Sequence, residues 1–254
     1  VVTDSGVPAQ YAQMVADQCK DAHIITVPQG EASKSMKILE SVLRQMLEFN
    51  MGRGDLVVAM GGGVVGDLAG FAAAIYMRGI DFINCPTTTL SMIDSSIGGK
   101  TAVDLGETKN IVGSFWQPKL VIVDPDTLST LPRRHYINGL AEAVKAGLLA
   151  DPELFAIFEK GDIDTQISEI IYRSLRFKKN VVEQDETERG MRKALNFGHT
   201  IGHGIVFQQA EPHLNVGVLL AELVQLGLQP GQVVRHQRDT DADAHRLGRL
   251  DLRM

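Results

Sequence analysis

The sequence predicts an α/β domain with a parallel sheet over residues 1–131, followed by an all-α domain over residues 132–254. In the first part, short apolar runs typical of buried strands alternate with stretches of helical spacing. After Pro132, the runs of β-branched residues stop and only helical periodicity continues. We therefore expect a doubly wound sheet domain and then a helical domain.

Strands are expected where apolar runs are bounded by turn residues, namely at 1–4, 23–27, 56–60, 81–85 and 120–124. Helices are expected where apolar residues recur at spacings of three and four, namely at 9–20, 36–50 and 64–77. Residues 86–101 are dense in hydroxyls and glycines, so we expect a polar loop there, with another around Lys109. Helical spacing in the second part covers 136–150, 152–159, 163–186 and 194–207.

The composition is that of an ordinary globular protein, with 254 residues of which 44% are hydrophobic and 22% charged. A net charge of −6 argues against a nucleic-acid-binding surface. The two cysteines, Cys19 and Cys85, suggest no disulfide framework and therefore a reducing, cytoplasmic compartment. No apolar run is long enough to span a membrane, and no secretory leader is recognised. Because Val1 lies in a strand-like run, we expect a fragment that lacks its first strands.

A glycine-rich turn follows the apolar run 56–60 and precedes a helical stretch. Glycine allows a sharp turn and a close approach of the backbone to a ligand, and the helix that follows directs free N–H groups at an anion. Gly61, Gly63 and Gly66 also match the spacing of the dinucleotide fingerprint. The alternative is a tight turn needed only for packing. Asp81, about twenty residues on, is either the usual ribose partner or a strand-end charge.

The second part contains two pairs of side chains that each share one helical face. Glu142 and Lys145 are three apart, which fits either a surface ion pair or a polar site. His199 and His203 are four apart, which fits either a metal such as zinc or a hydrogen-bonded interior pair. One of these histidines with Glu142 and a third group would leave a metal position open for a substrate oxygen.

Eight motifs occur in order, at 61–67 (GGGVVGD), 76–79 (YMRG), 87–88 (TT), 94–100 (DSSIGGK), 109–110 (KN), 139–145 (GLAEAVK), 185–192 (DETERGMR) and 196–203 (NFGHTIGH). Together they resemble the 3-dehydroquinate synthase family over residues 1 to about 204. The resemblance implies a Rossmann-like NAD-binding domain followed by a helical metal- and substrate-binding domain.

The implied activity is that of a carbon–oxygen lyase of the shikimate pathway, which leads to chorismate and the aromatic amino acids. Its substrate would be 3-deoxy-D-arabino-heptulosonate 7-phosphate and its products 3-dehydroquinate and phosphate. In this family, NAD⁺ transiently oxidises the substrate, phosphate is eliminated, the ketone is reduced and an aldol step closes the ring. The resemblance implies NAD and Zn²⁺, with Co²⁺ as a possible substitute, in a cytoplasmic homodimer.

The resemblance also assigns residues. The metal ligands would be Glu142, His199 and, as the nearest candidate for the third, His213. The cofactor would be bound by Asp4, Glu31, Lys34, Gly62, Gly63, Val64, Asp67, Thr87, Thr88, Lys109 and Thr130. The substrate and its reaction would be served by Arg78, Asp94, Lys100, Asn110, Lys145, Lys178, Glu188, Arg192, Asn196 and His203. Arg78 would reach across a dimer to phosphate bound by the second subunit, and Asp81 becomes a structural residue.

The sequence departs from the family after about residue 205. The His-Gly-Glu segment that supplies the third metal ligand in the family is absent, and 229–254 is polar with little apolar periodicity. Three alternatives therefore stand beside the main hypothesis. They are a related sugar-phosphate cyclase with another substrate, a metal-dependent polyol dehydrogenase, and an inactive NAD-binding fragment.

Overall fold

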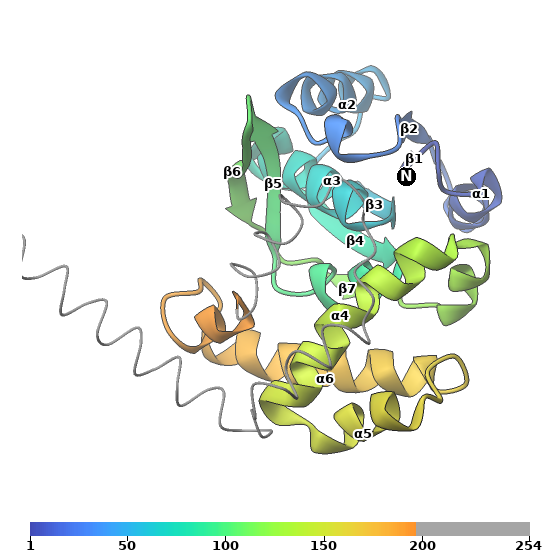
Figure 1. Cartoon of the computed structure of the whole chain (residues 1–254). Helices are drawn as coiled ribbons and strands as arrows, with labels where there is room; N and C mark the ends of the chain where they lie inside the picture. The colour runs from blue at the N-terminus through green and yellow to red at the C-terminus, as the bar shows by residue number, and fades with distance from the viewer. Residues whose placement is uncertain (197–254) are drawn as a thin grey trace, which may run out of the picture. The chain divides into compact units, whose positions relative to one another are not determined.

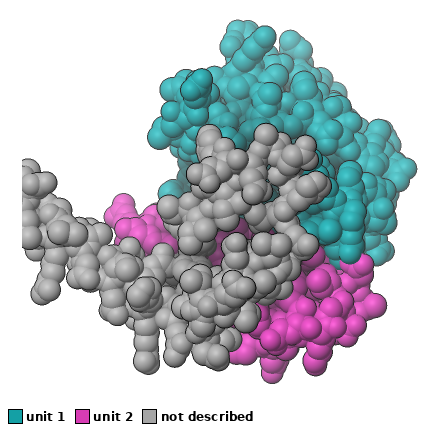
Figure 2. Space-filling view, viewed as in Figure 1, with its two compact units in different colours: residues 1–139 teal, residues 140–254 magenta. Residues whose placement is uncertain are grey.

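The computed structural model describes residues 1–196. The chain forms two compact units, Val1–Gly139 and Leu140–Met254, which are coloured separately in Figure 2. The division falls within helix α4 (Arg133–Ala150), eight residues beyond the boundary that the sequence suggested at 131/132. The boundary at 131/132 stays a prediction.

The first unit is built on a five-stranded parallel sheet, as the sequence predicted (Figure 1). Its strands are β1 (Val2–Asp4), β2 (Ile25–Val27), β3 (Leu56–Gly61), β4 (Asp81–Pro86) and β7 (Leu120–Val121). They lie in the order β2-β1-β3-β4-β7. The strand order therefore reverses between β1 and β3, which is the position where ligands bind in open α/β sheets.

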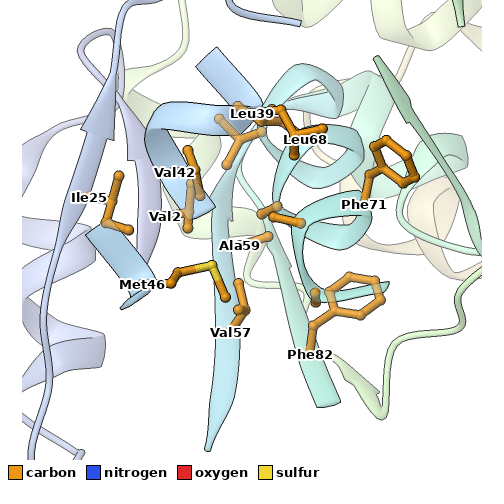
Figure 3. Packing of buried hydrophobic residues seen from close by; sticks show 14 of the residues in the cluster. Val2, Ile25, Leu39, Val42, Met46, Val57, Ala59, Leu68, Phe71 and Phe82 are labelled. Carbon is orange, nitrogen blue, oxygen red and sulfur yellow. The ribbon is translucent and has the colours of Figure 1, made fainter. Parts of the chain in front are cut away.

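Helices cover both faces of this sheet. They are α1 (Ala9–Ala16), α2 (Met36–Glu48) and α3 (Gly63–Ile75). Because successive strand residues point to opposite faces, Val57 and Ala59 of β3 pack in the core formed with α2 and α3 (Figure 3). Val58 and Met60 lie in a second cluster with residues of α1. The doubly wound, Rossmann-like arrangement is thus confirmed.

A β-hairpin forms where the sequence suggested polar loops. Strands β5 (Lys100–Leu105) and β6 (Thr108–Phe115) pair antiparallel, joined by two residues of which Gly106 has a left-handed φ of 60°. The expected loop at Lys109 was therefore wrong. The hairpin buries Val103 against the core but leaves most of β6 exposed, so the apolar signal of the strand is weak.

Short helical turns connect these elements. They are η1 (Glu31–Ser33), η2 (Tyr76–Arg78), the π-helical η3 (Ser91–Ser95) and η4 (Pro125–Thr130). Each of the four contains a predicted site residue, namely Glu31, Arg78, Asp94 and Thr130.

The second unit is helical over its described part. It contains α5 (Pro152–Lys160), α6 (Ile167–Gln184) and the short η5 (Met191–Asn196), together with most of α4. Helix α5 starts where the Asp151 carboxylate accepts the N–H of Leu154, and it ends at Gly161, which has a left-handed φ of 80°. Within residues 1–196, no helix combines the length and apolar character needed to cross a bilayer.

Candidate functional site

The glycine turn lies at the carboxyl end of β3, where α3 begins. None of its three glycines has a left-handed φ. A Cβ on Gly61 would lie 2.6 Å from Val65 Cγ2, and one on Gly63 would lie 3.0 Å from Ser95 Oγ. These contacts are with the chain's own side chains, so the approach of the backbone to a ligand stays a prediction, and the turn itself needs no unusual backbone. Glycine is required because neighbouring side chains occupy the space of a Cβ.

The amino end of α3 has no side-chain cap within the described residues. Its N-cap, Gly62, offers no capping side chain, so the first N–H groups of this 13-residue helix are not satisfied in that way. The buried hydroxyl of Ser95, beside Gly63, also has no hydrogen-bond partner among the described residues. Donors at a helix amino end together with an unpartnered hydroxyl form a cradle suited to a phosphate group.

Two predicted cofactor residues flank this turn on the neighbouring strands. Continuing the β1–β3 register, in which Val2 pairs with Ala59, places Asp4 level with Gly61. Asp4 is 8% exposed, and its Oδ1 accepts the N–H of Gly6 at 2.7 Å. On the other side, the N–H of Thr87 bonds the carbonyl of Gly61 at 2.9 Å. The sheet thus brings Asp4, the glycine turn and Thr87 to one edge.

Lys34 and Asp67 form a buried ion pair. Their Nζ and Oδ2 atoms are 2.6 Å apart, and the side chains are 6% and 21% exposed. These residues are 33 positions apart in the sequence, so the fold brings together two side chains that the resemblance assigned to the cofactor. Glu31 and Lys109 are also in that set, and their Oε1 and Nζ atoms lie 3.5 Å apart at the surface.

A cavity of about 310 Å³ lies beside this ion pair. It is lined by residues of η1, of the start of α2 and of the β5–β6 turn, among them Glu31, Lys34 and Asp104. The cavity is therefore part of the predicted cofactor region.

The remaining predicted cofactor residues in the described part are Thr88, Thr130 and Val64. The Thr88 and Ser91 hydroxyls are 2.8 Å apart, and Thr88 Oγ1 also accepts the N–H of Ser91 at 3.2 Å. This threonine therefore caps the turn into η3. Thr130 Oγ1 lies 3.2 Å from the Tyr11 hydroxyl, and Val64 is in the first turn of α3.

Asp81 lies at the amino end of its strand, too far from the glycine turn to bind a ribose beside it. It begins β4 and pairs in register with Leu56 at the start of β3, whereas the glycines are at the carboxyl end. Its carboxylate lies 3.6 Å from Lys119 Nζ, and both side chains are exposed. Asp81 is therefore a strand-end charge.

Four predicted substrate residues are in the first unit. Arg78 is exposed at the end of η2, and Lys100 is exposed at the start of β5. Asp94 is in η3, and Asn110 is in β6 with a left-handed φ of 55°. Arg78 also has a left-handed φ, of 71°. Such a conformation in a non-glycine residue is uncommon and occurs preferentially at functional sites.

In the second unit, Glu142 and Lys145 form an ion pair between Oε2 and Nζ. Their side chains are 21% and 14% exposed, so this is not the solvated surface pair of the alternative reading. Lys145 Nζ also donates to the carbonyl of Leu195 at 2.6 Å, which joins α4 to η5. Lys178, on α6, is 8% exposed.

Arg192 is almost fully buried, with 2% exposure, and is held by a tight loop. The Asp185 carboxylate accepts three backbone N–H groups, from Arg189, Gly190 and Arg192, at 2.7 to 3.0 Å. Partial burial raises the pKa of Asp185, but these three N–H groups and the Arg192 charge outweigh it, so the pKa lies below its usual range. Glu188, in the same loop, has a left-handed φ of 58°.

Several predicted residues lie outside the described part. They are His199, His203 and His213, and for Asn196 only the position at the end of η5 is described. Among residues 1–196, no three His, Cys, Asp or Glu side chains gather as a metal site. Glu142 is thus the one predicted metal ligand in the described part.

Sequence reasoning did not single out Ser95, Trp116 or Asp185 as separate site candidates. Ser95 and Asp185 lay within quoted motifs, but nothing in the sequence shows that one is buried beside Gly63 or that the other closes a loop. The one feature of the sequence that distinguishes Trp116 is that it is the sole tryptophan of the chain.

Comparison with known proteins identifies the family. Residues 24–138 match the family model described as 3-dehydroquinate synthase N-terminal, and residues 139–227 match 3-dehydroquinate synthase C-terminal. The 3-dehydroquinate synthase of Clostridium perfringens (strain 13 / Type A) is 49% identical over 189 residues, which is 73% of this chain and 54% of that protein. The 3-dehydroquinate synthase of Caulobacter vibrioides (strain NA1000 / CB15N) is 45% identical over 254 residues, with coverage of 91% and 68%.

A solved structure agrees with these relatives. It is 2-epi-5-epi-valiolone synthase from Streptomyces hygroscopicus subsp. jinggangensis 5008 with NAD⁺ and Zn²⁺ bound. Its TM-score is 0.75 at 31% identity, and the match covers 84% of this chain and 62% of that one. This chain spans about half the length of the Clostridium relative. From its motifs, its fold and these relatives, the chain belongs to the 3-dehydroquinate synthase family.

Proposed function

We propose that this chain is the NAD-, metal- and substrate-binding part of a 3-dehydroquinate synthase. The reaction would convert 3-deoxy-D-arabino-heptulosonate 7-phosphate to 3-dehydroquinate and phosphate. The observation that carries the proposal is the amino end of α3, where N–H groups without a side-chain cap and the Ser95 hydroxyl, which has no partner within residues 1–196, adjoin a turn without Cβ atoms. Family membership then selects the reaction among those that use a dinucleotide.

The residues around the glycine turn fit NAD. In the proposed site, Gly62, Gly63 and Val64 offer N–H groups to the pyrophosphate, and Asp4 lies level with them on β1. The buried Lys34–Asp67 pair and the cavity lined by Glu31 form the adjoining part of the site. Thr87, Thr88, Lys109 and Thr130 complete the proposed set.

For the metal, the proposed ligands are Glu142, His199 and His213. A carboxylate with two imidazoles is a donor set that zinc accepts with a position left open, and cobalt accepts the same donors. The partly buried Glu142 carboxylate is held by Lys145, which fixes its orientation. Bound NAD⁺ would supply a reversible hydride acceptor, and a bound divalent cation would supply a Lewis acid.

The substrate carries a carboxylate and a phosphate, so its site needs cations. We assign this role to Lys100, Lys145, Lys178 and Arg192, with Arg78 supplied from the second subunit of a homodimer. Lys178 and Arg192 are 8% and 2% exposed, and cations shielded from water interact strongly with a bound anion. Asp94, Asn110 and Asn196 would orient hydroxyl groups, and Glu188 with His203 would complete the polar network.

The chain's own residues would mainly bind and orient. The leaving phosphate is able to take the proton from the neighbouring carbon itself when both are held in the right geometry. Loss of one buried cation should therefore lower turnover through lost positioning of the substrate.

The test is phosphate release from the heptulosonate phosphate with NAD⁺ and added Zn²⁺. The variant Lys178→Met should lower kcat/KM by about 100-fold, the size expected for one charged hydrogen bond. The control is Lys179→Met, at the next position of α6. Lys179 is 64% exposed, in a surface pair with Glu183, so this change should have little effect. No phosphate release from folded wild-type chain would contradict the activity.

A related cyclase is the second candidate, because the similar solved structure is a 2-epi-5-epi-valiolone synthase. The 3-dehydroquinate synthase relatives are more similar, at 45% and 49% against 31% identity, which favours the main proposal. Comparing turnover of the heptulosonate phosphate with that of sedoheptulose 7-phosphate decides between them. Net accumulation of NADH would instead indicate a dehydrogenase, and NAD binding without stoichiometric zinc would indicate an inactive module.

A further inference from the structure

We infer that Trp116 is a positioning residue that holds two substrate-binding segments of the first unit in one arrangement. These segments are the Arg78 turn (77–79) and the segment 98–100, which ends at Lys100. The inference rests on the proposed function, because that proposal assigns Lys100 to the anionic groups of the substrate bound by its own subunit and Arg78 to those of the substrate bound by the second subunit. It adds a residue to which neither the sequence motifs nor the family resemblance gave a role.

The first contact of Trp116 is with the Arg78 turn. Met77, Arg78 and Gly79 all have left-handed φ angles, of 49°, 71° and 116°. Such a run persists only where the surroundings hold it. The indole Nε1 donates to the carbonyl of Ile80 at 3.0 Å, directly after the turn. A Cβ on Gly79 would lie 2.5 Å from the indole Cη2, so the turn lies directly against the ring and has no room for a side chain there.

The second contact is with the segment before β5. The backbone N–H of Trp116 donates to the carbonyl of Gly99 at 2.7 Å. Gly98 and Gly99 have left-handed φ angles, of 106° and 68°, so this segment also has an unusual backbone. Lys100 follows immediately, and it pairs in the hairpin with Phe115, the residue before Trp116. One residue therefore bonds both cation-bearing segments, which are about twenty positions apart.

The side chains of Arg78 and Lys100 are exposed, whereas Trp116, which contacts both of their segments, is half-buried. Among the described residues, Arg78 has no ion pair with a carboxylate that would fix it instead. Its position therefore depends on the backbone of the turn, which Trp116 holds together with two backbone bonds, from Gly79 N–H to the Tyr76 carbonyl and from Ile80 N–H to the Ala73 carbonyl. A turn held in the binding conformation avoids the ordering cost of capturing an anion.

A purely structural role is the competing explanation, because the ring also packs against the main core. The variant Trp116→Phe separates the two, since it keeps an aromatic ring and the backbone N–H that bonds Gly99 but removes the indole N–H that bonds Ile80. The matched control is Tyr76→Phe. It removes the bond from the Tyr76 hydroxyl to the Met51 carbonyl, at 3.0 Å, beside the same turn.

The first measurement is amide hydrogen exchange in the full chain. Trp116→Phe should speed exchange at 77–80 more than Tyr76→Phe does, because it removes the bond to Ile80. The backbone N–H at position 116, which donates to Gly99, should exchange slowly in the wild type and in both variants. A change at 77–80 no larger than that in Tyr76→Phe, or fast exchange of the Trp116 amide in the wild type, overturns the inference. This readout requires neither NAD, metal nor activity, so it stands even if the wild-type chain fails to turn over the heptulosonate phosphate.

The second measurement is binding of the heptulosonate phosphate by calorimetry, with NAD⁺ and Zn²⁺ present. Trp116→Phe should raise the dissociation constant about tenfold, the effect of one lost hydrogen bond that orders a site, and leave NAD affinity unchanged. Tyr76→Phe should lower the melting temperature without changing substrate affinity. A lower melting temperature with unchanged substrate affinity in Trp116→Phe would reduce Trp116 to a packing residue. Absence of substrate binding in the wild type refutes the proposed function instead.

Discussion

Breaking the Lys34–Asp67 pair should destabilise the first unit, and the loss of stability should differ according to which partner is removed. Asp67→Ala leaves an ammonium whose side chain is 6% exposed, whereas Lys34→Met leaves a carboxylate that is 21% exposed and better able to recover hydration. Removing one partner of a buried pair costs about 3–5 kcal/mol. We therefore expect a loss of about 3–4 kcal/mol for Asp67→Ala and of about 2–3 kcal/mol for Lys34→Met.

The assay is urea unfolding of the wild type, the two single variants and the double variant. The double variant removes both charges of the pair, so neither is left buried without the other. The double-mutant cycle should therefore give a coupling energy between Lys34 and Asp67 of about 2 kcal/mol. The matched control is the exposed pair of Glu40 and Arg44 on α2, at 62% and 72% exposure, with an expected coupling of about 0.3–0.5 kcal/mol. Equal couplings for the two pairs would refute the reasoning, because burial would then make no difference. NAD titration of the same variants reports whether the pair also serves the cofactor.

Three further outcomes are expected. Gly61→Ala should lower the free energy of unfolding by about 1–3 kcal/mol, because the new Cβ meets Val65, which is fully buried and unable to move aside; an unchanged urea midpoint would contradict the clash. Burial raises the pKa of Asp151, but a backbone N–H and Arg173 outweigh it and set the pKa below its usual value. The stability that ionised Asp151 contributes is complete above the unfolded pKa of about 4 and is lost as the pH falls through the folded pKa. The free energy of unfolding, measured from pH 5 to pH 2, should therefore fall less steeply in Asp151→Asn than in the wild type. Equal slopes would contradict this. Glu142→Gln should lower the zinc content of the purified chain, measured by elemental analysis, while NAD affinity stays unchanged; full zinc retention would remove Glu142 from the ligands.

Local patterns in the sequence were enough to predict the parallel sheet, its helices and the helical second part. A buried strand such as β3 and an amphipathic helix such as α2 each show their periodicity within about ten residues. The glycine turn was predictable for the same reason, because strand, glycines and helix are contiguous. The β5–β6 hairpin was missed because β6 is largely exposed and shows little apolar alternation.

For the candidate site too, some features could be predicted from local sequence and others required the tertiary structure. The sequence alone determined that the chain has a glycine turn between a strand and a helix, and which residue types accompany it. Only the tertiary structure decided that Asp4 is level with that turn while Asp81 is at the opposite edge, because strand register fixes the edge on which a residue lies. Only the tertiary structure also joined Lys34 to Asp67, and Trp116 to both Gly99 and Ile80. These contacts join positions 17 to 36 residues apart, and no local pattern records them, since each depends on how separate elements pack.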